Sequence, residues 1–318
     1  MSRRGKLPPV EKRLPQNPRV MPLEQGKTQG QPWRHAAVAR RAQPRHARCS
    51  RSTATRGWSS TRPTSRSFPT SSSRSKSIEG RSFTFKLRKG HRWSDGHPFT
   101  TEDFRYYWED VANNKELSPS GPPRDLLVDG EPPRVEIINE TTVRYTVAKP
   151  NPSFLPRLAG TSPLFIFRPA HYLKQFHKKY SAKVAKADAD GTAKRKWSAV
   201  HNRVDNMYES DNPDLPSLQP WVNTTKPPAD RFVAVRNPYF HRVDQSGRQL
   251  PYVDRFVLAI ADSKLIAAKT GAGEADLQAR DLQLQQLHLP QAEREEQQLP
   301  HAALARRARA RTSRCSRT

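Results

Sequence analysis

Four carboxylates in the first half of the chain are the first candidates for chemistry. Glu102, Asp103, Glu109 and Asp110 stand close to aromatic residues, and paired carboxylates can act as general acid and base when their pKa values differ. Helical spacing places most of them on a solvent-facing side, and Asp103 completes a Thr-x-x-Asp capping pattern that starts at Thr100. The sequence has no G-x-S-x-G, H-E-x-x-H or P-loop pattern. We therefore predict that the protein is not an enzyme.

Histidines are the second candidates, for metal binding. Two pairs, His91 with His97 and His171 with His177, are six residues apart, whereas two ligands on one helical face would be four apart. We expect these histidines to be solvated. Residues 188–191, DADG, resemble the start of a calcium loop but lack its later ligands and its distal glutamate. The sequence thus predicts a turn there, with no metal and no other cofactor.

Aromatic side chains are the third candidates, because they offer a ligand cleft a large contact area and lose few rotamers. We expect Trp93 and Trp108 to lie in the core instead. The full set is Trp93, Tyr106, Tyr107, Trp108 and Trp221.

Charge is distributed unevenly along the chain, which has 56 Lys and Arg, 30 Asp and Glu, and a formal net charge of +26. Residues 81–281 hold 31 basic and 24 acidic side chains, which leaves 25 basic and 6 acidic in 1–80 and 282–318. Arginine-rich ends could bind nucleic acid or an anionic surface, and this interaction role is the alternative function. We expect no nucleic acid as partner, because zinc-finger, helix-turn-helix and RNA-binding motifs are missing.

The periodic elements that would position these residues all lie in the middle of the chain. Strands alternating with helices predict an α/β domain. Strands are expected at 82–88, 135–138, 142–147, 231–236 and 252–260, and helices at 100–111, from Pro169 to Tyr180, and from Asp262, as the cap, to Lys269.

The two ends lack such periodicity. Residues 1–80 and 282–318 have few apolar side chains at a helical or strand period, so we expect both to be disordered tails around a domain at 81–281. Cys49 and Cys315 lie in these tails, and no disulfide is expected. The chain has no apolar run of 18 residues and no recognisable signal peptide.

One stretch carries a specific resemblance. Residues 82–96 read SFTFKLRKGHRWSDG and continue as HPFTTEDF. They resemble the "F-x-F-x-L-R-x-G … W-S-D-G-x-P-F-T-x-x-D-F" block of family 5 extracellular solute-binding proteins. Three more blocks follow in the family's order: PAHYL at 169–173, RNPYF at 236–240 with QLPYVD at 249–254, and GEAD at 273–276.

The resemblance implies a fold, a function and a location. Family members have two lobes, so we expect part of one lobe of a two-lobe, periplasmic-binding-protein-like fold with a mixed sheet. The implied function is the substrate-binding component of an ABC transporter for peptides, in a copy that is incomplete and impaired. An oligopeptide or similar small ligand and an ABC permease are the implied partners, and the implied location is periplasmic or extracellular. The ligand-binding candidates are Ser118 and Ser120, in the loop 116–127, and Trp221.

The ends suggest that this gene has been read out of frame. Residues 282–291, LQLQQLHLPQ, can be written in codons that decode as FSFNNYTFL after a one-base shift, which is similar to the family sequence after G-E-x-D. Residues 67–74, SFPTSSSR, similarly give IPNIVK, close to the family's P-N-(I/V)-A-K-S. We predict that 1–80 and 282–318 are out-of-frame segments, and the nucleotide sequence around codons 67–80 and 279–292 tests this.

Overall fold

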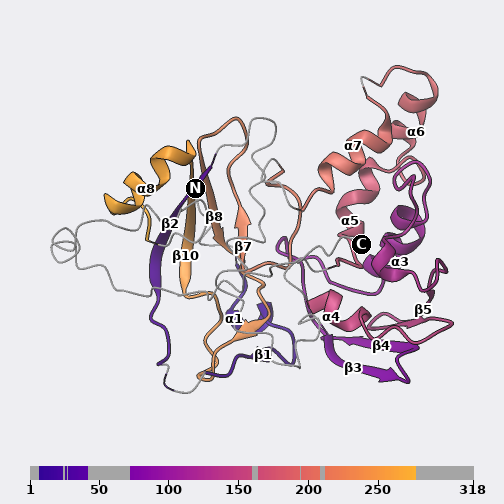
Figure 1. The fold of residues 1–318 in the computed structure, drawn as a ribbon, viewed down its shortest axis with the longest axis horizontal. Coiled ribbons are helices and arrows are strands. Elements are labelled where there is room, and N and C mark those ends of the chain that lie inside the picture. The colour runs from indigo at the N-terminus through magenta and orange to yellow at the C-terminus, as the bar shows by residue number, and fades with distance from the viewer. Residues whose placement is uncertain are drawn as a thin grey trace, which may run out of the picture.

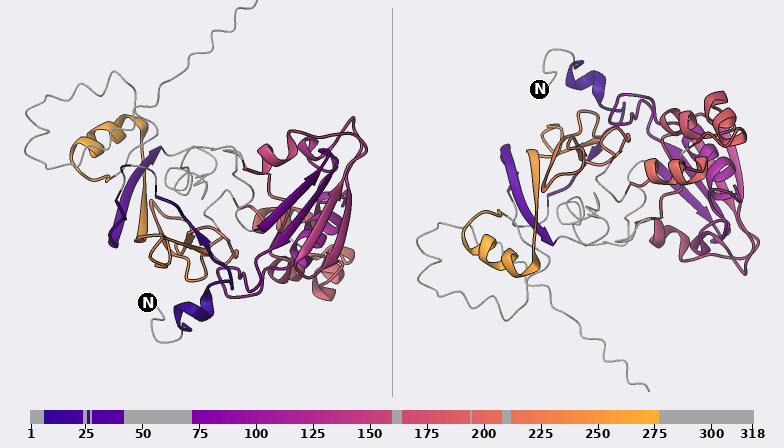
Figure 2. Two further views of the ribbon diagram at one scale, coloured as in Figure 1. Left: turned by 90° about the horizontal axis from the view of Figure 1, so that it is seen from below. Right: turned by 90° about the horizontal axis from the view of Figure 1, so that it is seen from above.

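Two sheets at opposite ends of the molecule organise the fold (Figures 1 and 2). The computed structural model describes residues 7–23, 26, 28–41, 72–159, 164–193, 195–207 and 212–276. Both sheets have four strands, in the orders β3-β4-β6-β5 and β2-β10-β8-β7. Within the described ranges, no helix has the length and apolar character needed to cross a membrane. The expected mixed α/β fold is confirmed.

The first sheet is antiparallel and follows the predicted alternation. It consists of β3 (Ser72–Ile78), β4 (Ser82–Leu87), β5 (Arg134–Asn139) and β6 (Thr142–Thr146). In β4, Phe83, Phe85 and Leu87 are buried and the side chains between them are not, because successive side chains of a strand point to opposite faces. The predicted β5–β6 hairpin is confirmed.

Short helices cover the inner face of this sheet. α3 (Glu102–Arg105) runs directly into a π-helical turn, η1 (Tyr106–Ala112). α4 (Phe154–Ala159), α5 (Ala170–Leu173) with its 3₁₀ continuation η3 (Lys174–Phe176), α6 (Ala182–Ala189) and α7 (Trp197–Val204) follow, and a 3₁₀ turn, η2 (Arg124–Leu126), lies in the loop before β5. Together with the sheet they enclose the larger apolar core, which includes Trp93 and Tyr106.

The second sheet is mixed. β2 (Trp33–Arg41) pairs in parallel with β10 (Val253–Ala261), and β10, β8 (Arg231–Arg236) and β7 (Trp221–Asn223) pair antiparallel. α8 (Ser263–Gly271) follows β10 and begins at Asp262, whose side chain accepts a hydrogen bond from the Lys264 N–H at 2.9 Å, as the cap prediction requires. A second apolar cluster, built on Ala36, Trp221, Phe232, Val253, Phe256 and Leu258, holds this sheet together.

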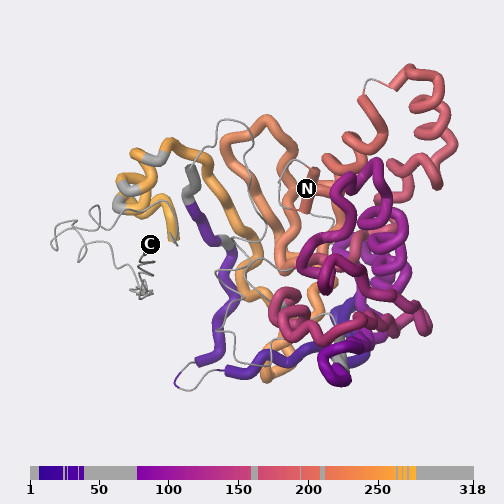
Figure 3. Tube along the Cα trace, turned by 45° about the vertical axis from the view of Figure 1, so that its right-hand side comes forward, coloured from indigo at the N-terminus to yellow at the C-terminus, as the bar shows by residue number. Residues whose placement is uncertain are grey.

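The prediction that residues 1–80 form a disordered tail is wrong for the part that the structure describes. α1 (Val10–Arg13), β1 (Arg19–Val20), β2 and β3 all lie in this range, and β1 pairs in parallel with β9 (Arg242–Val243). Figure 3 shows the N-terminal segment, in indigo, running along the lower edge of the molecule. Strand pairing uses backbone groups that every sequence has, so a segment with little apolar periodicity can still dock on strands far away in the chain.

Parts of the two predicted tails lie outside the described residues. These parts are 42–71 and 277–318, with Cys49, Cys315 and the segment 282–291. The out-of-frame hypothesis concerns codons, so it stays a prediction for 1–80 and 282–318.

Candidate functional site

The buried carboxylate of Asp103 is the centre of the W-S-D-G block. Its Oδ2 accepts hydrogen bonds from the Trp93 indole N–H at 3.0 Å and from the Thr100 backbone N–H at 3.1 Å, and its Oδ1 accepts one from the Ala170 N–H at 3.0 Å. The Asp103 carbonyl also accepts the Arg168 N–H at 3.1 Å. One side chain therefore joins the turn after β4, the start of α3 and the start of α5.

The Asp103 hydrogen bonds include the predicted capping contact and indicate the role of this carboxylate. Asp103 bonds to Thr100 as the capping pattern predicts, but it is buried rather than solvated. Burial raises its pKa to about 6, against the opposing effect of its N–H donors. Both carboxylate oxygens of Asp103 accept hydrogen bonds from protein N–H groups. Asp103 therefore has a structural role, linking three segments, rather than that of a general base.

The W-S-D-G turn also connects the first sheet to the second half of the molecule. The Ser94 N–H donates to the Ser217 carbonyl at 3.1 Å, and the Ser217 N–H donates to Ser94 Oγ at 2.9 Å. Gly96 has φ +94°, and a Cβ at this position would lie 2.9 Å from the Tyr239 hydroxyl. Only glycine fits this conformation and this close approach without strain. The turn is thus the contact point for residues that precede and follow β8.

A histidine pair lies beside this turn at the surface. His171 Nε2 is 2.7 Å from Asp95 Oδ2, and the His97 ring stacks on the His171 ring with centroids 3.8 Å apart. Burial opposes ionisation of Asp95, but the His171 and His97 hydrogen bonds outweigh it and lower its pKa. No group of three or more His, Cys, Asp or Glu among the described residues is arranged to hold a metal ion.

The remaining carboxylates form an ion-pair network. Arg105 contacts Glu102 at 2.7 Å, Glu109 at 2.6 Å and Asp110 at 3.2 Å, and Asp110 also contacts Lys179 at 2.7 Å. Asp110 is buried, so the prediction that it lies on a solvated helix face is wrong. The reason is the π-helical turn, which has more residues per turn than an α-helix and rotates Asp110 inward. Each of these carboxylates is occupied by a cation.

Among the histidines whose burial the structure describes, four are buried, contrary to the expectation of solvated rings. His91, His177, His201 and His241 each expose 2% of their surface or less. His201 Nε2 lies 2.7 Å from the Tyr106 hydroxyl, and His177 Nε2 lies 3.2 Å from the Asp110 carbonyl. Their sequence neighbours show no pattern that distinguishes a packed ring from a solvated one.

The predicted ligand-binding residues do not form one group in the structure. Ser118 is half-buried and Ser120 exposed, in the loop after η1, next to Leu117 of the larger core. Trp221 belongs to the second apolar cluster, where its indole N–H donates to the Val253 carbonyl at 2.9 Å. Their role toward a ligand stays a prediction. The expected burial of Trp93 is confirmed, and Trp108 packs partly buried against the same core.

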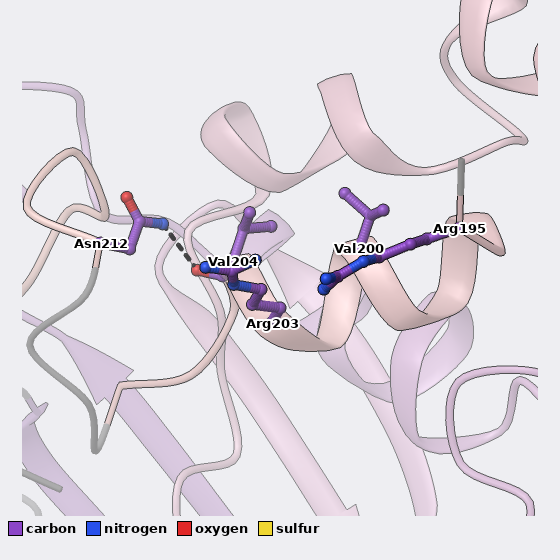
Figure 4. A pocket seen from close by; sticks show the side chains of 5 residues that line it. All are labelled: Arg195, Val200, Arg203, Val204 and Asn212. Atoms are coloured by element: carbon purple, nitrogen blue, oxygen red, sulfur yellow. Dashed lines mark hydrogen bonds between the residues drawn. The ribbon is translucent and has the colours of Figure 1, made fainter. Parts of the chain in front are cut away.

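A hollow on the α7 side is the feature that sequence reasoning missed. It has a volume of about 270 Å³ and is lined by Arg195, Val200, Arg203, Val204 and Asn212. In the close view, the Asn212 side chain donates to the Val204 carbonyl, at 2.9 Å, and so holds the chain after α7 against the helix end (Figure 4). The lining mixes apolar and cationic side chains.

Comparison with known proteins identifies the chain's relatives. The family model described as "Bacterial extracellular solute-binding proteins, family 5 Middle" matches residues 54–307. The chain belongs to family 5 of the bacterial extracellular solute-binding proteins. This match is wider than the predicted 81–281 and reaches into both predicted out-of-frame segments, so the exact domain limits stay a prediction.

Individual relatives of this family 5 chain are named for two kinds of solute, an α-galactoside and oligopeptides. The periplasmic alpha-galactoside-binding protein of Rhizobium meliloti is 32% identical over 203 residues, which cover 62% of this chain and 26% of the relative. The periplasmic oligopeptide-binding protein OppA of Escherichia coli is 30% identical over 113 residues, covering 31% of this chain and 20% of the relative. The chain thus spans well under half the length of the curated relatives that it matches.

Solved structures agree with the fold of this family 5 chain. An oligopeptide-binding protein OppA superposes with a TM-score of 0.67 at 30% identity, over 87% of this chain and 43% of that one. The periplasmic binding protein MelB of Agrobacterium fabrum, solved with stachyose, superposes with a TM-score of 0.60 at 25% identity, over 86% of this chain and 41% of that one.

Proposed function

We propose that this chain supplies one side of the ligand cleft in the solute-binding component of an ABC importer. The superposition on OppA over 87% of the chain is the observation that carries this proposal. The Asp103 and Ser94–Ser217 contacts support it, because they make a rigid frame on which a cleft can be built. The relatives are solute-binding proteins and lend no support to the alternative, a nucleic-acid or anionic-surface role.

An oligopeptide is the solute that we propose first. Peptides can be held through backbone groups and bridging water, which needs short polar side chains and little sequence specificity. Ser118 and Ser120 have suitable hydroxyls in an accessible loop. The indole N–H of Trp221 is already donated to the Val253 carbonyl. In this proposal Trp221 therefore supports the wall of the cleft by packing and gives the peptide no hydrogen bond.

An α-galactoside is the second candidate solute. It is favoured by the Rhizobium relative and by the MelB structure with stachyose. Sugar hydroxyls and peptide groups use the same kinds of hydrogen-bonding side chains, so Ser118 and Ser120 suit either solute.

The other parts of the proposal follow from the family. We propose an ABC permease as the membrane partner and the periplasm or extracellular space as the location. Solute-binding families are generally non-enzymatic, and every carboxylate of the α3–η1 region is held by a cation or by N–H donors. We therefore propose that the chain catalyses no reaction.

A chimera tests the proposed function. Residues 81–276 would replace the matching segment of E. coli OppA, and calorimetry would measure binding of tri- to pentapeptides and of stachyose. We expect peptide binding, and stachyose binding would select the second candidate. A folded chimera, as judged by circular dichroism, that binds neither solute would refute the proposal.

A further inference from the structure

Three arginines gather where the N-terminal segment meets both halves of the molecule. Arg19 of β1 and Arg242 of β9 are register partners in the parallel pair, so their side chains stand next to each other. Arg88, which directly follows β4, donates to the Asn17 carbonyl at 2.6 Å, and burial together with the nearby Arg19 lowers the pKa of Arg88. Like charges that face each other across two strands are destabilising.

Two buried imidazoles lie within this arginine cluster. The His91 and His241 ring centroids are 4.6 Å apart, and each residue is 2% exposed. Among the described residues, neither nitrogen of His241 has a hydrogen-bond partner, and His91 Nδ1 and the buried Nε of Arg19 also have none. Buried polar atoms nearly always have a hydrogen-bond partner. A group of buried nitrogens without one therefore indicates a place where a ligand that accepts hydrogen bonds could lie.

The electrostatics of the cluster have one sign. Burial, with Arg19 and Arg88 acting in the same direction, lowers the pKa of Arg242 to about 10. Burial also lowers the pKa of His241 well below its usual value, with His91 and the three arginines adding to the effect. The charged and ring neighbours that add to these two shifts are Arg19, Arg88, His91 and, for His241, Arg242. A negative charge at this place would oppose these shifts.

We propose that the Arg19–Arg242–His241 cluster binds a small oxyanion, with the Arg19 guanidinium and a His241 ring N–H as donors. Guanidinium groups match oxyanions because their donors form a rigid fork. A metal ion does not fit, since the arginines would repel it. Water could also satisfy the orphaned nitrogens, but an oxyanion forms a charge-assisted hydrogen bond with the Arg19 guanidinium, which is stronger. Arg19 and Arg242 are only partly buried, so an ion can reach the cluster from solvent.

The bound anion would link three segments of the fold. β1 belongs to the N-terminal segment, β9 and His241 belong to the second half, and His91 follows β4. An oxyanion that contacts all three would hold the N-terminal segment in place. This site does not depend on the proposed solute or on its cleft.

Inorganic phosphate is the probe for this site. The full chain would be titrated with phosphate at constant ionic strength, with chloride as the balancing anion, by calorimetry and by thermal melting. We expect one phosphate site and a rise in Tm. Arg19→Gln should weaken phosphate at least about tenfold, because it removes a charge-assisted donor. His241→Phe keeps a ring of similar size, removes both nitrogens and should weaken phosphate as well.

Arg255→Gln is the matched control, since Arg255 is an exposed strand arginine of the second sheet. It removes the same charge and should leave phosphate affinity within about twofold, as expected for an exposed charge. Equal weakening by Arg255→Gln would mean a general charge effect and overturn the proposal. The absence of phosphate binding to the wild-type chain would overturn it too. If Arg19→Gln does not fold, the wild type and His241→Phe still decide the outcome.

Discussion

At the scale of single residues, Asp103 shows how one side chain can define a family block. Three N–H groups from separate elements converge on its two oxygens. A charged acceptor strengthens such bonds roughly twofold over a neutral one. The Trp93 and Asp103 positions of the block W-S-D-G … D-F therefore serve the architecture of the fold.

Asp103→Asn tests this role. The amide keeps the size of the side chain but replaces one acceptor oxygen by an NH₂ group that faces other N–H donors. We expect the free energy of unfolding to fall by about 3 kcal/mol in urea titrations. Asp254→Asn, at an exposed strand position, is the control and should change it by less than about 0.5 kcal/mol. Equal effects from the two variants would contradict this structural role of Asp103.

Asp244 gives a pH prediction. Burial would raise its pKa, but hydrogen bonds led by the Ser246 and Tyr252 hydroxyls, at 2.7 and 2.8 Å, lower it to about 2. A carboxylate with a lowered folded-state pKa stabilises the fold fully above its unfolded pKa of about 4, and this stability is lost as the pH falls toward 2. The loss should be about 2 kcal/mol.

Unfolding measured between pH 5 and pH 2 checks the Asp244 prediction. Asp244→Asn removes the titrating group, so its stability should depend less on pH than that of the wild type over this interval. Parallel pH profiles for the two proteins would show that Asp244 contributes nothing to the acid response.

At the scale of elements, the turn after β4 decides how the first sheet contacts the chain around β8. Gly96→Ala should reduce the free energy of unfolding by about 2 kcal/mol, because the residue has a positive φ and its new Cβ would meet Tyr239. Gly121→Ala provides the matched control, since Gly121 has φ +73° and open space around it. The difference between the two variants in urea titrations measures the close approach alone. No difference would mean that Tyr239 moves aside freely.

The docking of β2 on β10 is a second prediction at this scale. Ala36 is 1% exposed and its strand pairs over its whole length. Ala36→Glu would bury a charge without a partner, which costs several kcal/mol, so we expect faster proteolysis within residues 28–41. Arg34→Glu, at an exposed position of the same strand, should not change the cleavage rate. If both variants are cleaved at the wild-type rate, β2 does not depend on its buried face.

At the scale of the whole molecule, the chain matches 43% of the OppA structure with which it superposes. In two-lobe binding proteins, closure of one lobe on the other buries the ligand. A surface that meets only one side of a peptide leaves much of the peptide in water. The Asp103 and Ser94–Ser217 contacts can therefore persist in a chain whose affinity for a peptide is low.

Calorimetry on the full chain tests this consequence. We expect tri- to pentapeptides to bind with a Kd weaker than about 1 mM, because much of the binding free energy in such pockets comes from enclosing the ligand. The OppA chimera described above is the control, since it joins residues 81–276 to the remainder of OppA. A micromolar Kd for the unmodified chain would show that one side is sufficient.

Short-range patterns in the sequence were enough to predict the local elements and the family. Alternation predicted β4, two short strands separated by a turn predicted the hairpin β5–β6, and Asp262 marked a helix start that the structure confirms. The predicted Thr100–Asp103 contact is also present, although the N-cap of α3 is Thr101. These features depend on neighbours a few residues apart, so short-range patterns suffice to find them. The ordered blocks from W-S-D-G to G-E-A-D were enough to name the family.

How distant segments meet is known only from the three-dimensional fold. The parallel pairs β1–β9 and β2–β10 join residues more than 200 positions apart, and neither their backbone hydrogen bonds nor the packing of Ala36 against β10 can be predicted from the neighbouring residues in the sequence. The burial of His91 and His241 beside three arginines has the same origin, since each residue is unremarkable among its sequence neighbours. Side-chain periodicity reports which face of an element is apolar, whereas the partner that covers that face is chosen by the fold as a whole.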